Sequence, residues 1–399
     1  ATRPSGPFGA LRYRDFRLLF SGMLISSLAM PMQWVAQMWL VIELADRSSA
    51  PLWLGITGFA RGLPLLLLSL YGGVTADRMD RRRLLFLSQL ASLVVAVAIG
   101  LFIAVGWINL WLVVVFALAS STVMSFDQPT RQALVPDLVR RDEVANAVAL
   151  NSMAMFGAMA IGPALSGFLI EWIGLAGTYF FIASTYLGVM LAVTLMRTVS
   201  HPSSAVRRSM VAEVREGLAY VRGEPVVLWL ISATFAITML GMSFTNLAPV
   251  LIKDVLGSNA KGLGLTFAAW GVGAVAASLV LALGLVGFAY SRNLWMASLF
   301  QLVPGASNTV FMVIGNAAIL SVTPPAVRGR VMGIYMMNRG LMPVGALAAG
   351  VLGGLLGVQA AIAILGVATF AAVVAVTLLQ PGAWRRVDAA IAAGTGATL

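Results

Sequence analysis

The sequence predicts an all-α, polytopic membrane protein with 12 transmembrane helices arranged as two pseudo-symmetric six-helix bundles. Of its 399 residues, 60% are hydrophobic, and the mean hydropathy is +0.92. A water-soluble protein of this length could not bury so much apolar surface. Apolar stretches of roughly 20 residues, the length that crosses a bilayer, recur along the chain. Basic residues gather in alternate connections between these stretches, as expected for a chain that crosses a membrane repeatedly.

Eleven stretches are long and apolar enough to be spans, and an ambiguous piece follows at 284–290. The spans lie near 18–44, 53–76, 84–106, 110–127, 146–171, 176–197, 226–252, 262–283, 294–320, 331–355 and 359–380. These limits predict four parts: an N-terminal bundle over 1–197, a cytoplasmic linker over 198–225, a C-terminal bundle over 226–380 and a cytoplasmic tail over 381–399. Apolar residues fall on one face of 209–222, which predicts an amphipathic helix on the inner membrane surface. A solvated tether is the alternative.

The two halves show a weak internal repeat, as many transport proteins do. Residues 54–62 align with 263–271, and Gly162-Pro163 aligns with Met342-Pro343. The repeat predicts a second charged turn near 286–292, but 262–290 is long enough for one helix only. We therefore expect roughly 25–30 residues, a basic loop and half of a span, to be missing near 281–286.

The basic residues predict the orientation of the chain. With the N-terminus placed inside, 20 of the 26 lysines and arginines fall in cytoplasmic segments and four in outer loops. This bias predicts that the N- and C-termini are both cytoplasmic. It also accounts for the net charge of +11, so no nucleic-acid partner is expected. The basic N-terminus runs into an apolar stretch too long for a signal peptide, so none is expected.

Composition also excludes several classes of chemistry. The chain has no cysteine and a single histidine, His201, which excludes disulfides, cysteine-bound zinc and thiol catalysis. No metal and no cofactor are expected. An enzyme would need clustered histidine, aspartate or glutamate at membrane depth, and a receptor or scaffold would carry a sizeable soluble domain. Neither pattern is visible, so neither class is expected.

A charged turn is predicted at 72–83, between two spans. Within it, four arginines and two aspartates occupy seven residues. A carboxylate among arginines at a helix terminus gains charge-assisted hydrogen bonds, and such a cluster at a bundle interface can form in one conformation and break in another. A solvated, positively charged anchor is the alternative. The gating candidates are Gly73, Asp77, Arg78, Arg81 and Arg82.

Three groups of residues carry a family resemblance. The charged turn resembles the signature loop between helices two and three of the major facilitator superfamily, with Asp80 where the family usually has glycine. The run from Ala158 to Gly167 resembles the antiporter motif of the drug-exporting branches; its key residues here are Gly162, Pro163 and Gly167. Segments 131–139, 215–218 and 328–332 resemble the bacterial exporters that include enterobactin and macrolide efflux proteins.

The resemblance implies a monomer in the bacterial cytoplasmic (inner) membrane, with alternating access around a central cavity. It implies secondary active export of amphipathic small molecules of the drug or siderophore type, coupled to protons. A lipid, sugar or organic-anion cargo, carried by a facilitator or importer, is the alternative. Asp77 and Arg78 would then help to lock the cytoplasmic side. The Gly162-Pro163 pair is interpreted as a hinge or as ordinary close helix packing.

Charges inside spans are costly in lipid and usually face a cavity or a partner. Arg61 and Arg339 are the two basic residues inside predicted spans, so we expect at least one to face the cavity and to favour anionic or acceptor-rich cargo. A salt bridge or a backbone cap is the alternative. Further cavity candidates, each of which could instead form an interhelical hydrogen bond, are Gln33, Trp34, Gln37, Asn246, Gln301, Asn308 and Asn338.

Proton coupling usually needs an acid at membrane depth, and the acids here lie near predicted span ends. Glu43 and Asp127 are the candidates. By comparison with the better-known drug/proton antiporters of the resembling family, Asp127 lacks their arginine-bearing motif on the fourth span. The chain has no ATP-binding sequence, which favours a proton gradient as the energy source.

Overall fold

The computed structural model describes residues 8–140, 143–197, 218–263, 265–266, 288–301, 331 and 342–379, apart from some side chains, notably those of 69–74 and 76–78. The described residues form helices, turns and connections and no strand. Seven helical stretches among them are long and apolar enough to cross a membrane, which confirms the all-α membrane class.

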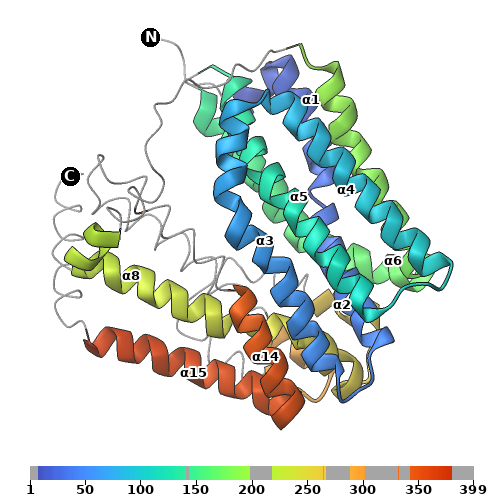
Figure 1. Ribbon diagram of the computed structural model, residues 1–399, viewed down its shortest axis with the longest axis vertical. Helices are drawn as coiled ribbons and strands as arrows, with labels where there is room; N and C mark the ends of the chain where they lie inside the picture. The colour runs from blue at the N-terminus through green and yellow to red at the C-terminus, as the bar shows by residue number, and fades with distance from the viewer. Residues whose placement is uncertain are drawn as a thin grey trace.

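The first half consists of long helices that form one bundle (Figure 1). They are α1 (Arg14–Ser26), α2 (Ala29–Leu44), α3 (Ala50–Arg78), α4 (Arg81–Ala104), α5 (Leu110–Asp137) and α6 (Val144–Leu195). The first span predicted by the sequence is therefore α1 and α2 together, and α6 covers two predicted spans. Gly174 divides α6 with φ 71° and ψ 177°, a conformation that suits glycine because it has no Cβ.

Helices α1 and α2 are separated at Ser27 and Leu28 inside the first span. Pro31 has no backbone N–H, so the Ser27 carbonyl cannot receive the usual bond from the residue four positions later. In addition, the Leu28 N–H bonds to Ile25 O, three positions earlier, at 3.1 Å, which is a tighter turn than an α-helix makes. This break matters for function because it borders the cavity described below.

The structure corrects two predicted boundaries. Helix α3 continues to Arg78, so the predicted turn over 72–83 is reduced to Met79 and Asp80. Asp80 caps α4, because its carboxylate accepts from the Arg82 N–H at 2.9 Å. Helix α5 continues ten residues beyond its predicted end at 127, with Pro129 and Pro136 inside it. Thr130 is buried and Asp127 and Arg131 are partly buried against neighbouring helices, whereas Gln132 and Asp137 are exposed. The charged residues at 127 and 131 therefore have partners within the bundle and do not end the helix.

The second half is described in part. Residues 225–255 form one irregular helical rod, which confirms the predicted span at 226–252. Its pieces are α8 (Pro225–Ala236), the π-helix η3 (Ile237–Gly241), the 3-10 turn η4 (Ser243–Asn246), α9 (Ala248–Val250) and the π-helix η5 (Leu251–Val255). Helices α14 (Met342–Leu356) and α15 (Val358–Leu379) follow, divided by Gly357 at φ 81°. Most of the linker, the tail and the predicted break near 281–286 lie outside the described residues.

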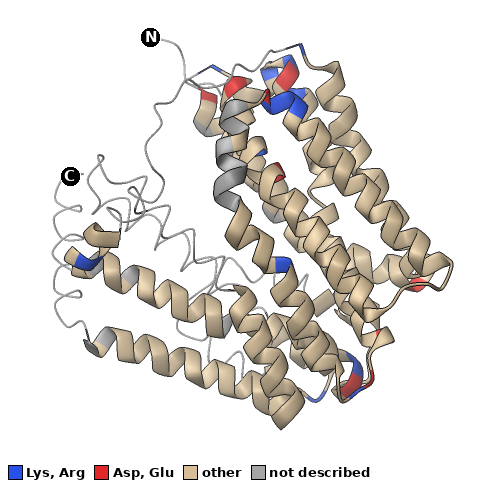
Figure 2. Cartoon of the chain, viewed as in Figure 1, with Lys and Arg blue, Asp and Glu red and all other residues tan. Residues whose placement is uncertain are grey.

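We call the end of the first bundle with the α3–α4 turn the inner end and the opposite end, with the α2–α3 connection, the outer end. Figure 2 shows charged residues gathered mainly at these two ends, with the helices between them largely uncharged. The most extensive described contact between the halves lies along the outer part of α3, which packs on α14, and within the second half α8 packs beside α15 (Figure 1). Helices α2 and α6 also contact the second half. A buried core that includes Val35, Trp39, Phe244 and Leu247 joins both halves there.

This contact, which we call the outer seam, depends on small residues. A Cβ on Gly55 would come within 2.9 Å of both the Ala346 carbonyl oxygen and Gly350 Cα. A Cβ on Gly62 would overlap the ring of Pro343. The two backbones therefore approach as closely as they do only because glycine occupies these positions.

Candidate functional site

A cavity of about 130 Å³ lies inside the first half. It is bordered by the break between α1 and α2 and by residues of α3, α4, α5 and α6, so it is formed by helices from the whole bundle. Its lining combines five methionines, Met23, Met30, Met124, Met155 and Met159, with serine and glutamine side chains. Three charged residues, Arg61, Asp127 and Arg131, complete it.

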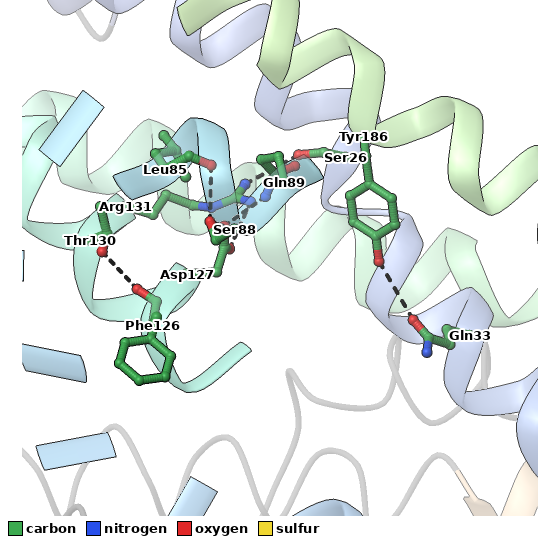
Figure 3. Close-up of polar contacts among 10 residues, drawn as sticks. All are labelled: Ser26, Gln33, Leu85, Ser88, Gln89, Phe126, Asp127, Thr130, Arg131 and Tyr186. Carbon is green, nitrogen blue, oxygen red and sulfur yellow. Dashed lines mark hydrogen bonds and ion pairs between the residues drawn. The ribbon is translucent and has the colours of Figure 1, made fainter. Parts of the chain in front are cut away.

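Asp127 is the centre of a polar network at the wall of this cavity (Figure 3). Its Oδ1 accepts hydrogen bonds from Gln89 Nε2 at 2.6 Å and from Ser88 Oγ at 2.8 Å, both from α4. Its Oδ2 pairs with Arg131 Nη2 at 3.0 Å, one turn further along α5. Arg131 also donates to Ser26 Oγ at 3.2 Å. One carboxylate thus connects α5 to α4 and, through Arg131, to the end of α1.

A second polar group lies on the α2 side of the cavity. Gln33 donates from Nε2 to Ser120 Oγ at 2.8 Å, and the Tyr186 hydroxyl donates to Gln33 Oε1 at 3.5 Å (Figure 3). These bonds join α2, α5 and α6. Both partners of the Gln33 amide are hydroxyl groups, which can donate as well as accept, so the amide is held between α5 and α6.

Arg61 projects from the middle of α3 to the cavity wall. Its Nη1 atom is shielded from solvent and has no hydrogen-bond partner within the described residues. A guanidinium has five N–H donors and is always charged, so an unused donor at this depth carries a desolvation cost.

The predicted cavity candidates therefore divide. Gln33 and Arg61 line the cavity, whereas Gln37 donates to Val113 O at 3.4 Å and Trp34 packs against the core. Asn246 lies at the outer seam, where a Cβ on Gly58 would come within 2.7 Å of its Oδ1. Gln301 is fully buried, does not line the cavity and has no hydrogen-bond partner for its amide within the described residues. The others, Arg339, Asn308 and Asn338, lie outside the described residues.

The two acids singled out for proton coupling lie in different surroundings. Asp127 was expected near a span end, and the structure corrects this point, because α5 extends ten residues past it. Arg131, one turn further along the same helix, pairs with it. Glu43 is exposed at the outer end of α2 and accepts from Trp39 Nε1 at 2.6 Å. Arg131 was counted with the cytoplasmic arginines and is instead a cavity residue.

The arginines of the charged turn hold the inner end of the first bundle together. Arg81 Nη1 pairs with Asp137 Oδ2 at 2.8 Å, at the end of α5. Arg82 donates to the carbonyls of Val193 at 2.7 Å and Thr194 at 3.1 Å, at the end of α6. The backbone at Gly73, Asp77 and Arg78 belongs to the last turns of α3, and their side chains lie outside the described set.

The residues of the antiporter-like motif lie where α6 contacts other helices. A Cβ on Gly162 would come within 2.6 Å of Pro31 Cγ on α2, and one on Gly167 would overlap the Ala260 carbonyl of the second half. Ser166 Oγ donates to Met32 O at 2.9 Å. Pro163 lies inside the helix and is buried. This part of α6 therefore packs on both α2 and the second half.

Sequence reasoning missed most of the network around Asp127. Ser26, Ser88, Gln89 and Arg131 come from three helices, so no sequence spacing brings them together. The spacing of four residues between Asp127 and Arg131 was a usable signal, since such pairs share a helix face. Among the described residues, no group of three histidines or acids is placed to hold a metal ion.

Comparison with known proteins identifies the family. A family model described as transmembrane secretion effector, of the major facilitator superfamily, matches residues 5–283. The chain is 27% identical over 362 residues to the staphyloferrin A transporter of Staphylococcus aureus, an alignment that covers 84% of this chain and 89% of that protein. It is 24% identical to the multidrug resistance protein MdtG of Proteus mirabilis, over 76% of this chain and 79% of that protein.

Solved structures agree on the fold. A bacterial homologue of the human lysosomal transporter Spinster, inward-facing and unoccupied, has a TM-score of 0.67 at 14% identity and covers 96% of both chains. A POT family transporter in complex with a thioalcohol-conjugated peptide has a TM-score of 0.69 at 12% identity, over 93% of this chain and 96% of that one. The chain belongs to the transmembrane secretion effector family of the major facilitator superfamily; it is a polytopic membrane transporter of small molecules and not an enzyme.

Proposed function

We propose that this transporter exports amphipathic small molecules across the bacterial cytoplasmic membrane and that protons entering through Asp127 drive the export. In this proposal a monomer alternates access between its N-terminal half, 1–197, and its C-terminal half, 226–380. The observation that carries the proposal is the cavity wall, where a partly buried acid with an arginine partner lies beside an adaptable apolar surface.

The lining favours amphipathic cargo. Methionine side chains are flexible and polarizable, so they adapt to apolar groups of different shape. The serine and glutamine side chains beside them supply hydrogen bonds that orient a polar group. Relatives named as a staphyloferrin A transporter and a multidrug resistance protein are consistent with cargo of this kind.

The charge distribution supports an inner end that faces the cytoplasm. Arg81, Arg82 and Arg83 lie at this end, and transferring Arg131 to the cavity leaves the positive-inside bias strong. The described contacts between the halves lie toward the outer end. We therefore propose that this conformation is inward-facing. Asp77 and Arg78 would close the inner end in the opposite state.

Asp127 is better placed than Glu43 to couple protons. It lies on the cavity wall and its charge is held by Arg131, Ser88 and Gln89. Protonation would remove the charge that holds Arg131, and Arg131 also contacts Ser26 at the end of α1. A proton taken up here would therefore alter contacts among α1, α4 and α5, which is the kind of rearrangement that alternating access needs.

The test is fluorescence-quench recovery in energised everted vesicles, titrated with a panel of dyes, macrolides and catecholate compounds. We expect recovery that depends on the wild-type protein and on one class of compound, and a loss of at least about tenfold in Asp127→Asn. Asp46→Asn is the matched control, because Asp46 is an exposed acid at the outer end.

Each negative result removes a different part of the proposal. Wild-type recovery for no member of the panel would argue against amphipathic export. Wild-type recovery that survives in Asp127→Asn, with its dependence on the proton gradient unchanged, would exclude Asp127 as the coupling acid.

A further inference from the structure

We propose that Arg61 forms an anion subsite in the cavity and binds a carboxylate, or another group with a single negative charge, on the transported molecule. The inference deepens the proposed function and rests on it, since it names the chemical group by which this cavity would select its cargo. It depends on the position of Arg61 and on where negative charge is located along the chain.

The position comes first. Arg61 borders the same cavity as the methionines and the Asp127 network, and its Nη1 atom has no partner among the described residues. A planar guanidinium matches the two oxygens of a carboxylate, so one such ligand can use two donors at once. The apolar part of the cargo would then lie against Met124, Met155 and Met159.

The charge balance inside the cavity comes second. Of the described residues that line it, Asp127 is the acid, and Arg61 and Arg131 are the bases. Asp127 is already engaged by Arg131 at 3.0 Å and by two neutral donors of α4. The pair neutralises itself, so the described part of the lining retains one positive charge, on Arg61.

The predicted spans of the second half contain no acid beyond Asp254. The sequence contains no aspartate or glutamate between Asp254 and Asp388. Asp254 lies 3.8 Å from Arg47 at the outer end, and Asp388 belongs to the predicted tail. The spans predicted by the sequence between 262 and 380 therefore contain no carboxylate.

The remaining acid on the helix of Arg61 is distant. Asp77 lies 16 residues further along α3, which is roughly 24 Å at the rise of an α-helix. A charge inside a membrane protein is normally balanced by a partner or by water. For Arg61, a negatively charged ligand would balance the charge, and it would also make the transporter selective for such ligands.

The probe pair for the test is octanoate and octanamide, which differ in charge but have the same chain and nearly the same size. Binding of each to the purified full-length protein in detergent would be measured by isothermal titration calorimetry. We expect octanoate to bind at least about tenfold tighter than octanamide, because a charge-assisted bond to a buried guanidinium is strong.

Three variants separate the subsite from a general effect of charge. Arg61→Gln should abolish the preference for octanoate, and Arg61→Lys should retain part of it. Arg83→Gln is the matched control: Arg83 is exposed at the inner end, so the preference should persist. Circular dichroism and gel filtration would confirm that each variant is folded. A folded Arg61→Gln protein that still prefers octanoate would overturn the inference.

Two further measurements separate the cargo subsite from an inorganic-ion site and from export itself. If sodium chloride binds in an Arg61-dependent way while octanoate shows no advantage over octanamide, the partner is an inorganic ion and the cargo assignment is wrong. Efflux of a neutral dye separates this inference from the proposed function. Dye efflux in a wild-type protein without octanoate preference would reject only the subsite, whereas octanoate preference without any efflux would reject only the export.

Discussion

Two regions of the molecule hold helices together by opposite means. At the outer seam, α3 and α14 approach through glycine and proline, with backbone against backbone at Gly55 and Gly350. At the cavity, helices of the first half are joined through charged and polar side chains around Asp127. The seam joins the two halves, whereas the network lies within one half.

The difference indicates how each region could respond during transport. Close packing of small residues is lost all at once when two surfaces separate, because dispersion contacts fall off steeply with distance. A hydrogen-bonded ion pair can instead be altered by one proton without moving the backbone. The seam is therefore suited to a gate between two conformations, and the network to sensing a proton or a cargo.

The largest effect on stability is expected from breaking the ion pair. Arg131→Met leaves Asp127 without its counter-charge, which costs about 3 kcal/mol, the lower end for buried pairs. We use the lower end because the Arg131 and Asp127 side chains are still 15% and 13% exposed. The free energy of unfolding would be measured by denaturant titration in mixed micelles.

Arg83→Met is the control for this prediction, because the arginine is exposed and its loss should change stability by less than about 0.5 kcal/mol. The double variant Asp127→Asn/Arg131→Met should recover part of the loss, since it removes both charges. Equal stability of the two single arginine variants would show that the pair contributes little.

The second effect concerns the outer seam. A Cβ at Gly350 would come within 2.6 Å of the Pro51 carbonyl oxygen and 2.8 Å of Gly55 Cα. Gly350→Val should therefore destabilise the present conformation, in which the outer seam is closed and which we call outer-closed, by about 1–3 kcal/mol. The chain has no cysteine, so Met124→Cys gives a single label site in the cavity. Its reaction with an impermeant maleimide added outside cells should accelerate about 5- to 150-fold.

The control lies one turn away on α14. A Cβ at Gly354 would meet no described residue within 4 Å, so Gly354→Val should leave the labelling rate unchanged. If both valines alter labelling equally, close approach at Gly350 is not what keeps the outer side closed.

The smallest effect is expected from two basic residues that bridge the halves at the outer end. Lys253 donates to Ile42 O at 2.8 Å and lies 5.7 Å from the centre of the Trp39 ring. Lys253→Met should weaken the outer-closed conformation by about 1–2 kcal/mol, through loss of a charged hydrogen bond and a cation–π contact. The same labelling assay would measure it.

Arg47→Met is the comparison, because Arg47 faces Asp254 at 3.8 Å and its side chain is 88% exposed. Exposed ion pairs contribute about 0–1 kcal/mol, so its effect should be the smaller of the two. An Arg47 effect as large as that of Lys253 would mean that charge, and not burial, dominates this end.

Helix α5 shows how far sequence reasoning reached. Its apolar first part predicted a span and gave the correct start at residue 110. Its end was placed ten residues too early, because Asp127, Pro129 and Arg131 look like the beginning of a loop. Proline and charge end a helix in water, but here the neighbouring helices α1 and α4 supply partners for the polar groups.

The site followed the same pattern. Arg61 and Gln33 were identified from their residue type inside predicted spans, since polar groups there are costly and rarely without a role. Asp127 was identified as an acid near a predicted span end. Gln37 and Asn246 have the same chemistry but face Val113 and Gly58, away from the cavity. Which way a polar side chain points depends on the packing of helices distant in sequence, and a single sequence does not contain that information.

The sequence by itself determined the class of protein, the number and approximate position of most described spans, and the charge asymmetry between the two ends. Each follows from the cost of placing polar or charged groups in lipid, which acts on one segment at a time. Only the tertiary structure decided that Arg131 pairs with Asp127, that Arg61 has no such partner among the described residues, and that Gly55 meets Gly350. Gly55 and Gly350 lie on different helices, and the surroundings of Asp127, Arg131 and Arg61 are formed by neighbouring helices. All three features therefore depend on how the whole chain packs.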